Sequence, residues 1–216
     1  MDKDNLNTIK RYNDRIKTLG FNSVALGWTR PNVEIRLKAL INCLPFDISG
    51  MNVLDVGCGL GDLYLLIKDR DVNYTGIDIN QKLINHCINL NFGCNFICMD
   101  IHEYSLQAGK YQKPNVVFLS GLFNHKREDK QERKFLESTI RKAFELSTHG
   151  VVFNVLTDKV DYFTKHNFNH SPNQIINLAY SLSNCVILDN TVLKYELSVG
   201  VFKAQLNEKL LVNTFK

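Results

Sequence analysis

An apolar run that leads into three glycines at alternate positions constrains the fold of this chain most. Residues 53–63 read Val-Leu-Asp-Val-Gly-Cys-Gly-Leu-Gly-Asp-Leu. The apolar start predicts a buried β-strand, and the pattern after the glycines predicts an α-helix. Glycines let the backbone turn tightly and approach a ligand closely, and a helix start offers free N–H groups. This segment therefore predicts a ligand-binding strand–turn–helix unit.

The rest of the chain alternates short β-type runs with helical patterns, which favours an α/β fold with a mostly parallel sheet and helices on both faces. The last two runs are separated only by a short turn, so the last strand is expected to be antiparallel. Besides the run at 52–56, strands are predicted at 72–77, 95–99, 115–119, 151–155, 185–188 and 198–202.

Helix signals lie between these strands. A helix is expected over about 127–147, ended by Gly150 in a left-handed conformation, and others are capped by Asn80 or opened by Ser171 and Pro172. Two further helices should precede the sheet, the second starting at Pro31. The first carries a loose apolar stripe made of Leu6, Ile9, Ile16 and Leu19.

Length and composition point to one soluble domain. With 216 residues we expect a single domain over 1–216, with a helical cap at 1–50 and an α/β core at 51–216. The net charge is only +4 and basic residues are interspersed with acidic ones, so a nucleic-acid partner is not indicated. We find no signal peptide, no membrane span and no zinc-type cysteine spacing, and we expect a cytoplasmic protein with buried free thiols.

The glycine turn has two candidate ligand classes. A dinucleotide site wants Gly-x-Gly-x-x-Gly, but the last position is Asp62 here, and its carboxylate would repel a pyrophosphate. The pattern in this chain is acidic-x-Gly-x-Gly-x-Gly, headed by Asp55. It resembles motif I of the class I, Rossmann-like methyltransferases that use S-adenosylmethionine (SAM), a ligand with an ammonium and a sulfonium. The resemblance implies cofactor contacts at Asp55, Gly57, Cys58, Gly59 and Gly61.

Two later acidic residues fit the same resemblance. Asp78, at the end of the second strand, is placed to accept hydrogen bonds from ribose hydroxyls, with Ile79 beside it. Asp100 and Ile101 follow the third strand, where methyltransferases often bind adenine. An alternative for Asp100 is that it only caps a turn.

A narrower resemblance, to a group of small bacterial methyltransferases of unsettled substrate, extends over most of the chain. It is carried by the segments 25–28, 61–64, 120–124 and 153–154 and by Arg36. It implies that the segment 120–124 lies on the acceptor side, with Ser120 also contacting the cofactor and Asn124 acting as a catalytic residue. The segment 120–124 lacks the Asp-Pro-Pro-Tyr or Asn-Pro-Pro-Tyr motif of DNA amino-methyltransferases, which disfavours methylation of base amines.

Arg36 and Trp28 are further candidates near the cofactor. Arg36 is expected to pair with the SAM carboxylate or with an anionic substrate, and the alternative is a surface arginine. Trp28 is expected to form part of a lid, and the alternative is a packing residue.

Methyl transfer from a sulfonium is an in-line displacement that needs alignment and exclusion of water. A hydroxyl acceptor also needs a base, and His125, beside Asn124, is the first choice over His102, His166 and His170. A neutral amine needs none. We therefore predict a monomeric or homodimeric enzyme that methylates a hydroxyl or amine of a small molecule, such as a sugar, surface-glycan or natural-product precursor, and releases S-adenosylhomocysteine (SAH).

Three alternatives stay open at this point. They are an RNA methyltransferase, a non-catalytic SAM-binding module that regulates a partner, and a nucleotide-dependent oxidoreductase. No acidic cluster suggests a metal-dependent enzyme.

Overall fold

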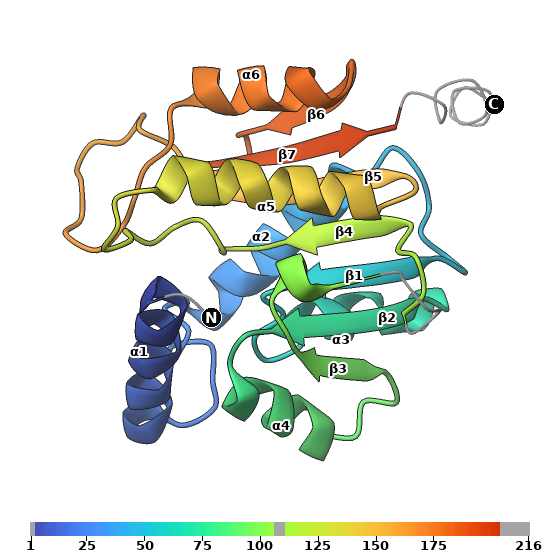
Figure 1. The fold of residues 1–216 in the computed structure, drawn as a ribbon, viewed down its shortest axis with the longest axis vertical. Helices are drawn as coiled ribbons and strands as arrows, with labels where there is room; N and C mark the ends of the chain where they lie inside the picture. Colours follow the sequence, from blue (N-terminus) through green and yellow to red (C-terminus); the bar gives the residue numbers. More distant parts are fainter. Residues whose placement is uncertain (1–2, 106–110, 204–216) are drawn as a thin grey trace.

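One seven-stranded sheet runs through the molecule in the order β3-β2-β1-β4-β5-β7-β6 (Figure 1). The computed structural model describes residues 3–105 and 111–203. The other residues of the predicted domain 1–216 lie outside these ranges. β1 to β5 are parallel, and β7 is antiparallel to both β5 and β6, which confirms the predicted Rossmann-like sheet. The strands are β1 (Asn52–Val56), β2 (Asn73–Asp78), β3 (Asn95–Cys98), β4 (Val116–Leu119), β5 (Gly150–Leu156), β6 (Cys185–Asp189) and β7 (Glu196–Phe202).

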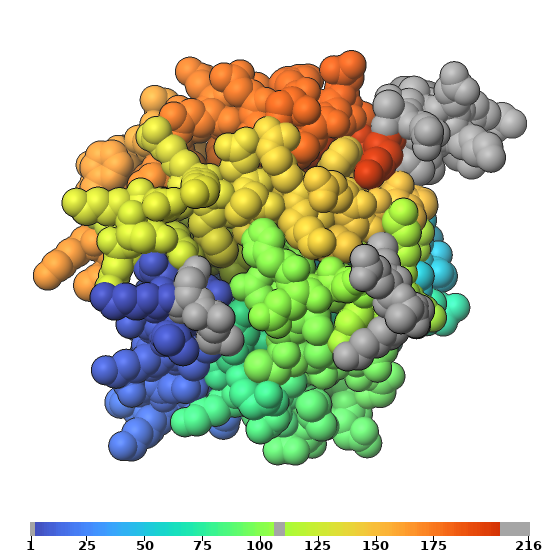
Figure 2. Space-filling model, viewed as in Figure 1, coloured from blue at the N-terminus to red at the C-terminus, as the bar shows by residue number. Residues whose placement is uncertain are grey.

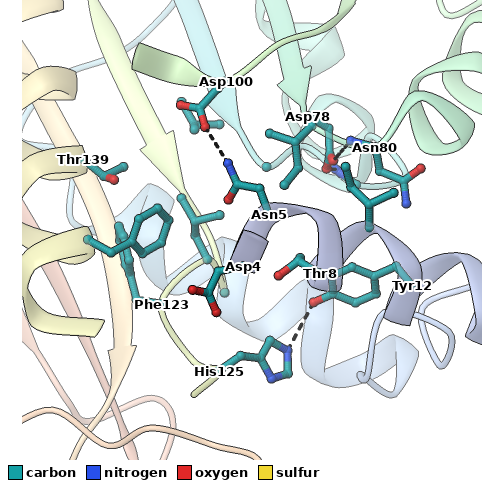
Figure 3. A pocket seen from close by; sticks show the side chains of 18 of the residues that line it. Asp4, Asn5, Thr8, Tyr12, Asp78, Asn80, Asp100, Phe123, His125 and Thr139 are labelled. Atoms are coloured by element: carbon teal, nitrogen blue, oxygen red, sulfur yellow. Dashed lines mark hydrogen bonds between the residues drawn. The ribbon is translucent and has the colours of Figure 1, made fainter. Parts of the chain in front are cut away.

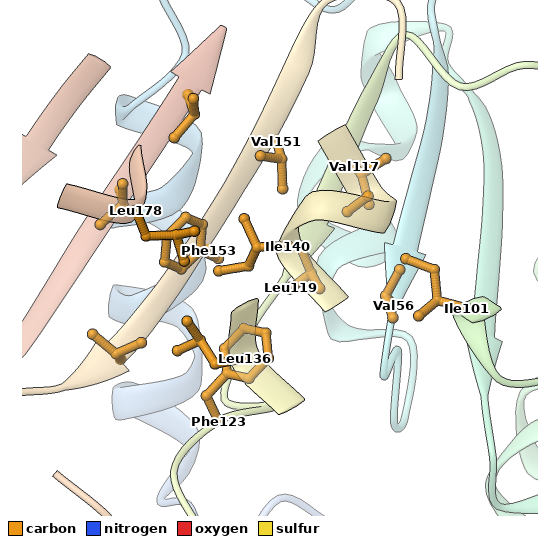
Figure 4. Packing of buried hydrophobic residues seen from close by; sticks show 14 of the residues in the cluster. Val56, Ile101, Val117, Leu119, Phe123, Leu136, Ile140, Val151, Phe153 and Leu178 are labelled. Atoms are coloured by element: carbon orange, nitrogen blue, oxygen red, sulfur yellow. The ribbon is translucent and has the colours of Figure 1, made fainter. Parts of the chain in front are cut away.

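Helices cover both faces of the sheet. On one face α2, α3 and α4 bury their apolar residues, and on the other face α5 and α6 pack over a cluster that includes Phe153 and Ile140 (Figure 4). Asn80 caps α4, as predicted, because its side chain accepts a hydrogen bond from the Lys82 N–H. The helices are α1 (Lys3–Leu19), α2 (Arg30–Asn42), α3 (Asp62–Ile67), α4 (Gln81–Asn89), α5 (Glu132–Leu146) and α6 (Pro172–Leu182), with the 3₁₀ turns η1 (Lys68–Arg70) and η2 (Ile101–Glu103).

Gly150 is not a helix cap, contrary to the prediction. α5 already ends at Leu146, and Gly150 is the first residue of β5. A Cβ atom at Gly150 would lie 2.3 Å from the carbonyl oxygen of Val201 on β7. The glycine is therefore needed because β5 and β7 approach each other closely.

α1 does not join the core as its predicted apolar stripe suggested. Ile16 is buried, but Leu6 and Leu19 are 56% and 43% exposed. The helix instead stands across the carboxyl ends of the parallel strands (Figure 1). In the space-filling view its atoms, in blue, lie directly below the yellow segment that follows β4 (Figure 2). α1 therefore covers the edge of the sheet at which open α/β folds bind ligands.

Of the helices in the described ranges, none has both the length and the apolar character needed to cross a membrane.

Candidate active site

A cavity lies between α1 and the carboxyl ends of β1, β2 and β4 (Figure 3). Its volume is about 170 Å³, far more than the roughly 10–15 Å³ that one water needs. A smaller cavity adjoins it at the glycine turn. Most of the predicted cofactor residues line one or both: Trp28, Arg36, Asp55, Gly57, Cys58, Gly59, Asp78, Ile79, Asp100, Ile101 and Ser120.

The turn between β1 and α3 has the tight backbone that its glycines predict. Gly57, Gly59 and Gly61 have φ of +74°, +56° and +77°, a region that side-chain-bearing residues rarely adopt. The N–H of Gly59 donates to Asp78 Oδ2 at 3.1 Å, which ties the turn to the end of β2. Gly61 lines neither cavity. It precedes the first turn of α3 and packs against Phe96.

Three carboxylates surround this turn. Asp55 is buried and accepts a hydrogen bond from the Tyr74 hydroxyl at 2.7 Å. Burial is the main reason that the pKa of Asp55 is raised to about 7. The hydrogen bond from Tyr74 lowers this pKa, whereas the charges of Asp78 and Asp62 raise it. Burial likewise raises the pKa of Asp78 to about 6. The carboxyl groups of Asp55 and Asp78 therefore border the turn, and Asp62 beside them forms an ion pair with Arg30.

Asp100 caps a turn, as the alternative predicted, and also lines the cavity. Its Oδ1 accepts from the His102 N–H at 2.9 Å and so caps η2. Its Oδ2 accepts from the Asn5 side chain of α1 at 3.0 Å, at the wall of the cavity (Figure 3). The Asp100 carboxylate therefore links η2 to α1 at the wall of the cavity that Ile101 also lines.

Arg36 is not the surface residue that the alternative expected, and its guanidinium is already paired with a carboxylate of the protein. It is 4% exposed, and its Nε lies 3.0 and 2.7 Å from the two carboxylate oxygens of Glu196. Its guanidinium also stacks on Trp28, at 3.5 Å from the ring centre. Glu196 therefore neutralises this arginine and holds it beside Trp28.

The same Glu196 links the buried arginine to the loop after β4. Its Oε2 accepts from the Asn154 side-chain Nδ2 at 2.8 Å, and the Asn154 side-chain Oδ1 accepts from the Gly121 N–H at 2.8 Å. Trp28 completes the arrangement, since a Cβ at Gly121 would lie 3.5 Å from its ring. This network fixes the backbone of the acceptor-side segment next to Ser120.

Asn124 lies behind the cavity wall. It is buried, lines neither cavity, and its side-chain oxygen accepts from the Leu156 N–H at 3.2 Å. This placement argues against the catalytic contact that we expected. Asn124 instead attaches the segment after β4 to the end of β5.

His125 does line the cavity. Its Nε2 lies 3.2 Å from the Tyr12 hydroxyl of α1, and its Nδ1 is buried with no hydrogen-bond partner (Figure 3). Burial, followed by the charge of Arg11, lowers the pKa of His125 to about 4, so the imidazole is neutral at pH 7. The alternatives fit less well, because His102 and His166 are exposed and His170 is buried against the Phe123 carbonyl oxygen.

α1 contributes to the cavity, which was not predicted from the sequence. The helix is attached to the segment after β4, because Asp4 Oδ1 accepts from the Glu128 N–H at 2.7 Å. A signal for this was present, since polar residues recur at helical spacing along α1. The α1 residues that line the cavity are Asp4, Asn5, Thr8, Ile9, Arg11 and Tyr12.

Comparisons with known proteins agree with this fold and turn. Residues 53–142 match a family model described as a methyltransferase domain. The ubiquinone biosynthesis O-methyltransferase of Coxiella burnetii is 28% identical over 109 residues, which are 45% of this chain and 47% of that protein. The chain thus spans about half the length of the curated relatives that it matches.

Two solved structures share the architecture over almost the whole chain. The magnesium protoporphyrin IX methyltransferase of Synechocystis PCC 6803, with bound SAM, has a TM-score of 0.68 at 13% identity, covering 94% of this chain and 99% of that one. The DhpI–SAM–HEP complex has a TM-score of 0.64 at 14% identity, covering 93% and 98%. The chain thus has the Rossmann-like fold of these class I methyltransferases, and its segment 53–142 is similar to their methyltransferase domain.

Proposed function

We propose that this protein binds SAM and transfers its methyl group to a hydroxyl or amine of a small molecule. The observation that carries the proposal is the gathering of the carboxyl groups of Asp55, Asp62 and Asp78 around the glycine turn. A pyrophosphate would be repelled there, whereas the ammonium and sulfonium of SAM would be attracted. This difference favours SAM over a dinucleotide.

The residues of the cavity fit the parts of this cofactor. Asp78 would accept hydrogen bonds from ribose hydroxyls, and Asp100 and Ile101 would hold adenine. The backbone of the glycine turn, with Ser120 and Trp28 nearby, would hold the amino-acid part. SAM supplies an already activated methyl group, so the protein has to align the acceptor and exclude water.

The covered cavity favours a small acceptor. α1 lies across the strand ends, and an RNA would have to displace it to reach them. The similar proteins whose names refer to ubiquinone biosynthesis and to magnesium protoporphyrin IX are consistent with such an acceptor. His125, neutral and fixed by Tyr12, is the residue that would accept a proton from a hydroxyl acceptor.

Calorimetric titration of the purified protein with SAH and, separately, with NADH tests the cofactor. We expect micromolar SAH binding that Asp78→Asn weakens about tenfold or more, since a charge-assisted hydrogen-bond pair is lost. Asp69→Asn, an exposed carboxylate in η1, is the control and should bind like the wild type. A preference for NADH would overturn the proposal. SAM binding without turnover across a broad acceptor screen would favour a regulatory module instead.

A further inference from the structure

Arg11 is a cation on the cavity side of α1 that no carboxylate of the described residues pairs with. Its Nε and Nη2 are buried without a hydrogen-bond partner, and its guanidinium lies 5.0 Å from the centre of the Tyr12 ring. Buried guanidinium donors without an acceptor are costly, so an arginine in this situation suits an anion supplied by a ligand.

The other arginines of the cavity walls differ from Arg11 in this respect. Each of them forms an ion pair with a carboxylate of the protein. The pairs are Arg36 with Glu196, and Arg127 with Asp4 and Asp129. Arg11 is therefore the cavity arginine whose charge the described part of the chain leaves uncompensated.

The position of Arg11 indicates which ligand it faces. It lines the main cavity together with Tyr12 and His125 but not the smaller cavity at the glycine turn. Arg15, one helical turn further on, adds a second positive charge, since its donors bind the carbonyl oxygens of Val24 and Ala25 rather than a carboxylate. The charges of both arginines lower the pKa of His125.

Carboxyl groups surround the turn where a cationic cofactor fits. At the end that holds His125, Asp4 is paired with Arg127, whereas Arg11 has no carboxylate partner among the described residues. We infer that Arg11 binds an anionic group of the methyl acceptor, a carboxylate or a phosphoryl group, placed beside the hydroxyl or amine that is methylated. This inference rests on the proposed function, because it takes the glycine-turn end for SAM.

The test uses inorganic phosphate as the probe on the full-length protein saturated with SAH. The Nε–H signal of Arg11 is followed by ¹H–¹⁵N NMR at constant ionic strength, and phosphate affinity is compared in Arg11→Gln and Lys10→Gln. Lys10 is exposed on α1, so this control removes the same charge from the same helix. We expect a saturable shift in the wild type, at least tenfold weaker phosphate binding in Arg11→Gln, and wild-type binding in Lys10→Gln.

A second comparison separates the acceptor from the cofactor as the source of the anion. SAH and 5′-methylthioadenosine, which lacks the amino-acid part, are titrated into the wild type and Arg11→Gln. Unchanged affinities for both, within about twofold, support the acceptor assignment and show that the variant is folded. Weaker binding of SAH alone would assign Arg11 to the cofactor carboxylate and overturn the inference, as would phosphate binding that does not depend on Arg11. Failure of the wild type to bind SAH would instead refute the proposed function.

Discussion

Asp55 is a buried carboxyl whose ionisation opposes folding. In the unfolded chain an aspartate ionises near pH 3.9, whereas burial raises the pKa of Asp55 in the folded protein to about 7. Between these values the folded protein binds more protons than the unfolded chain. The free energy of unfolding therefore falls as the pH rises from about 4 to about 7, and the loss is complete above that.

Asp55→Asn should remove this dependence, because the amide cannot ionise but still offers an oxygen to the Tyr74 hydroxyl. At about 1.4 kcal/mol per pKa unit, we expect the difference in unfolding free energy between pH 5 and pH 8 to shrink by about 3 kcal/mol. Urea unfolding of the ligand-free protein at both pH values measures it. Asp69→Asn, an exposed control, should keep the wild-type difference, and an unchanged difference in Asp55→Asn would contradict the explanation.

Single site residues were predictable from sequence where a local pattern fixes their place. Asp55, Asp78 and Asp100 follow or end strands, and parallel strands bring such positions to one edge. Arg36 was not predictable in the same way. Its partner Glu196 lies 160 positions along the chain, and no local pattern shows that the two side chains meet.

At the scale of elements, α1 is held mainly by polar contacts. Asp4 binds the Glu128 N–H, Asn5 binds Asp100, and Tyr12 binds His125, while Ile16 is its buried apolar residue. Elements with few buried apolar contacts open at low free energy. α1 should therefore separate from the sheet more readily than α2, which buries Leu37 and Leu40.

Hydrogen exchange tests this expectation. Amides of α1 should exchange at least tenfold faster than those of α2, and SAH should slow them if the cofactor lies beneath the helix. Asp4→Asn should speed the exchange of α1 further, whereas Asp14→Asn on its exposed side should not. Equal protection of α1 and α2 would mean that the polar contacts hold the helix as firmly as a core contact.

The pairing of β5 with β7 depends on the close approach at Gly150. Gly150→Ala should reduce the free energy of unfolding by more than about 3 kcal/mol, because the new methyl group would overlap the backbone oxygen of Val201. Gly50→Ala is a matched control, since its φ is +73° but no other atom lies within 4 Å of the added carbon. It should cost only about 1 kcal/mol. Urea unfolding measures the loss of unfolding free energy in both variants. Similar losses in the two would show that backbone strain, and not the contact with Val201, dominates at both sites.

The strands could be predicted from sequence better than the elements that define the cavity. Alternating β-type and helical runs identify the sheet. However, a glycine that ends a helix resembles one that starts a strand, so Gly150 was misassigned. A polar helix face toward a cavity likewise resembles one toward water, so the inward face of α1 went unrecognised.

On the scale of the whole molecule, Arg36 and Glu196 connect the N-terminal helices to β7. Removing one partner of a buried ion pair leaves an uncompensated charge, which costs about 3–5 kcal/mol. Arg36→Gln should therefore destabilise the protein by about that amount. The double variant Arg36→Gln/Glu196→Gln should regain part of the loss, because no lone charge stays buried. Urea unfolding of the two single variants and the double variant gives the coupling, and strictly additive losses would argue against it.

Two thiols below the glycine turn make its opening measurable. Cys58 is buried under Gly76, and the Cys87 thiol donates to the Gly59 carbonyl oxygen at 3.4 Å. Burial raises the pKa of both thiols, so neither reacts readily while the turn is closed. The rate at which these two thiols are alkylated therefore reports how often the turn opens. A ligand bound on the turn would lower this alkylation rate without contacting either sulfur.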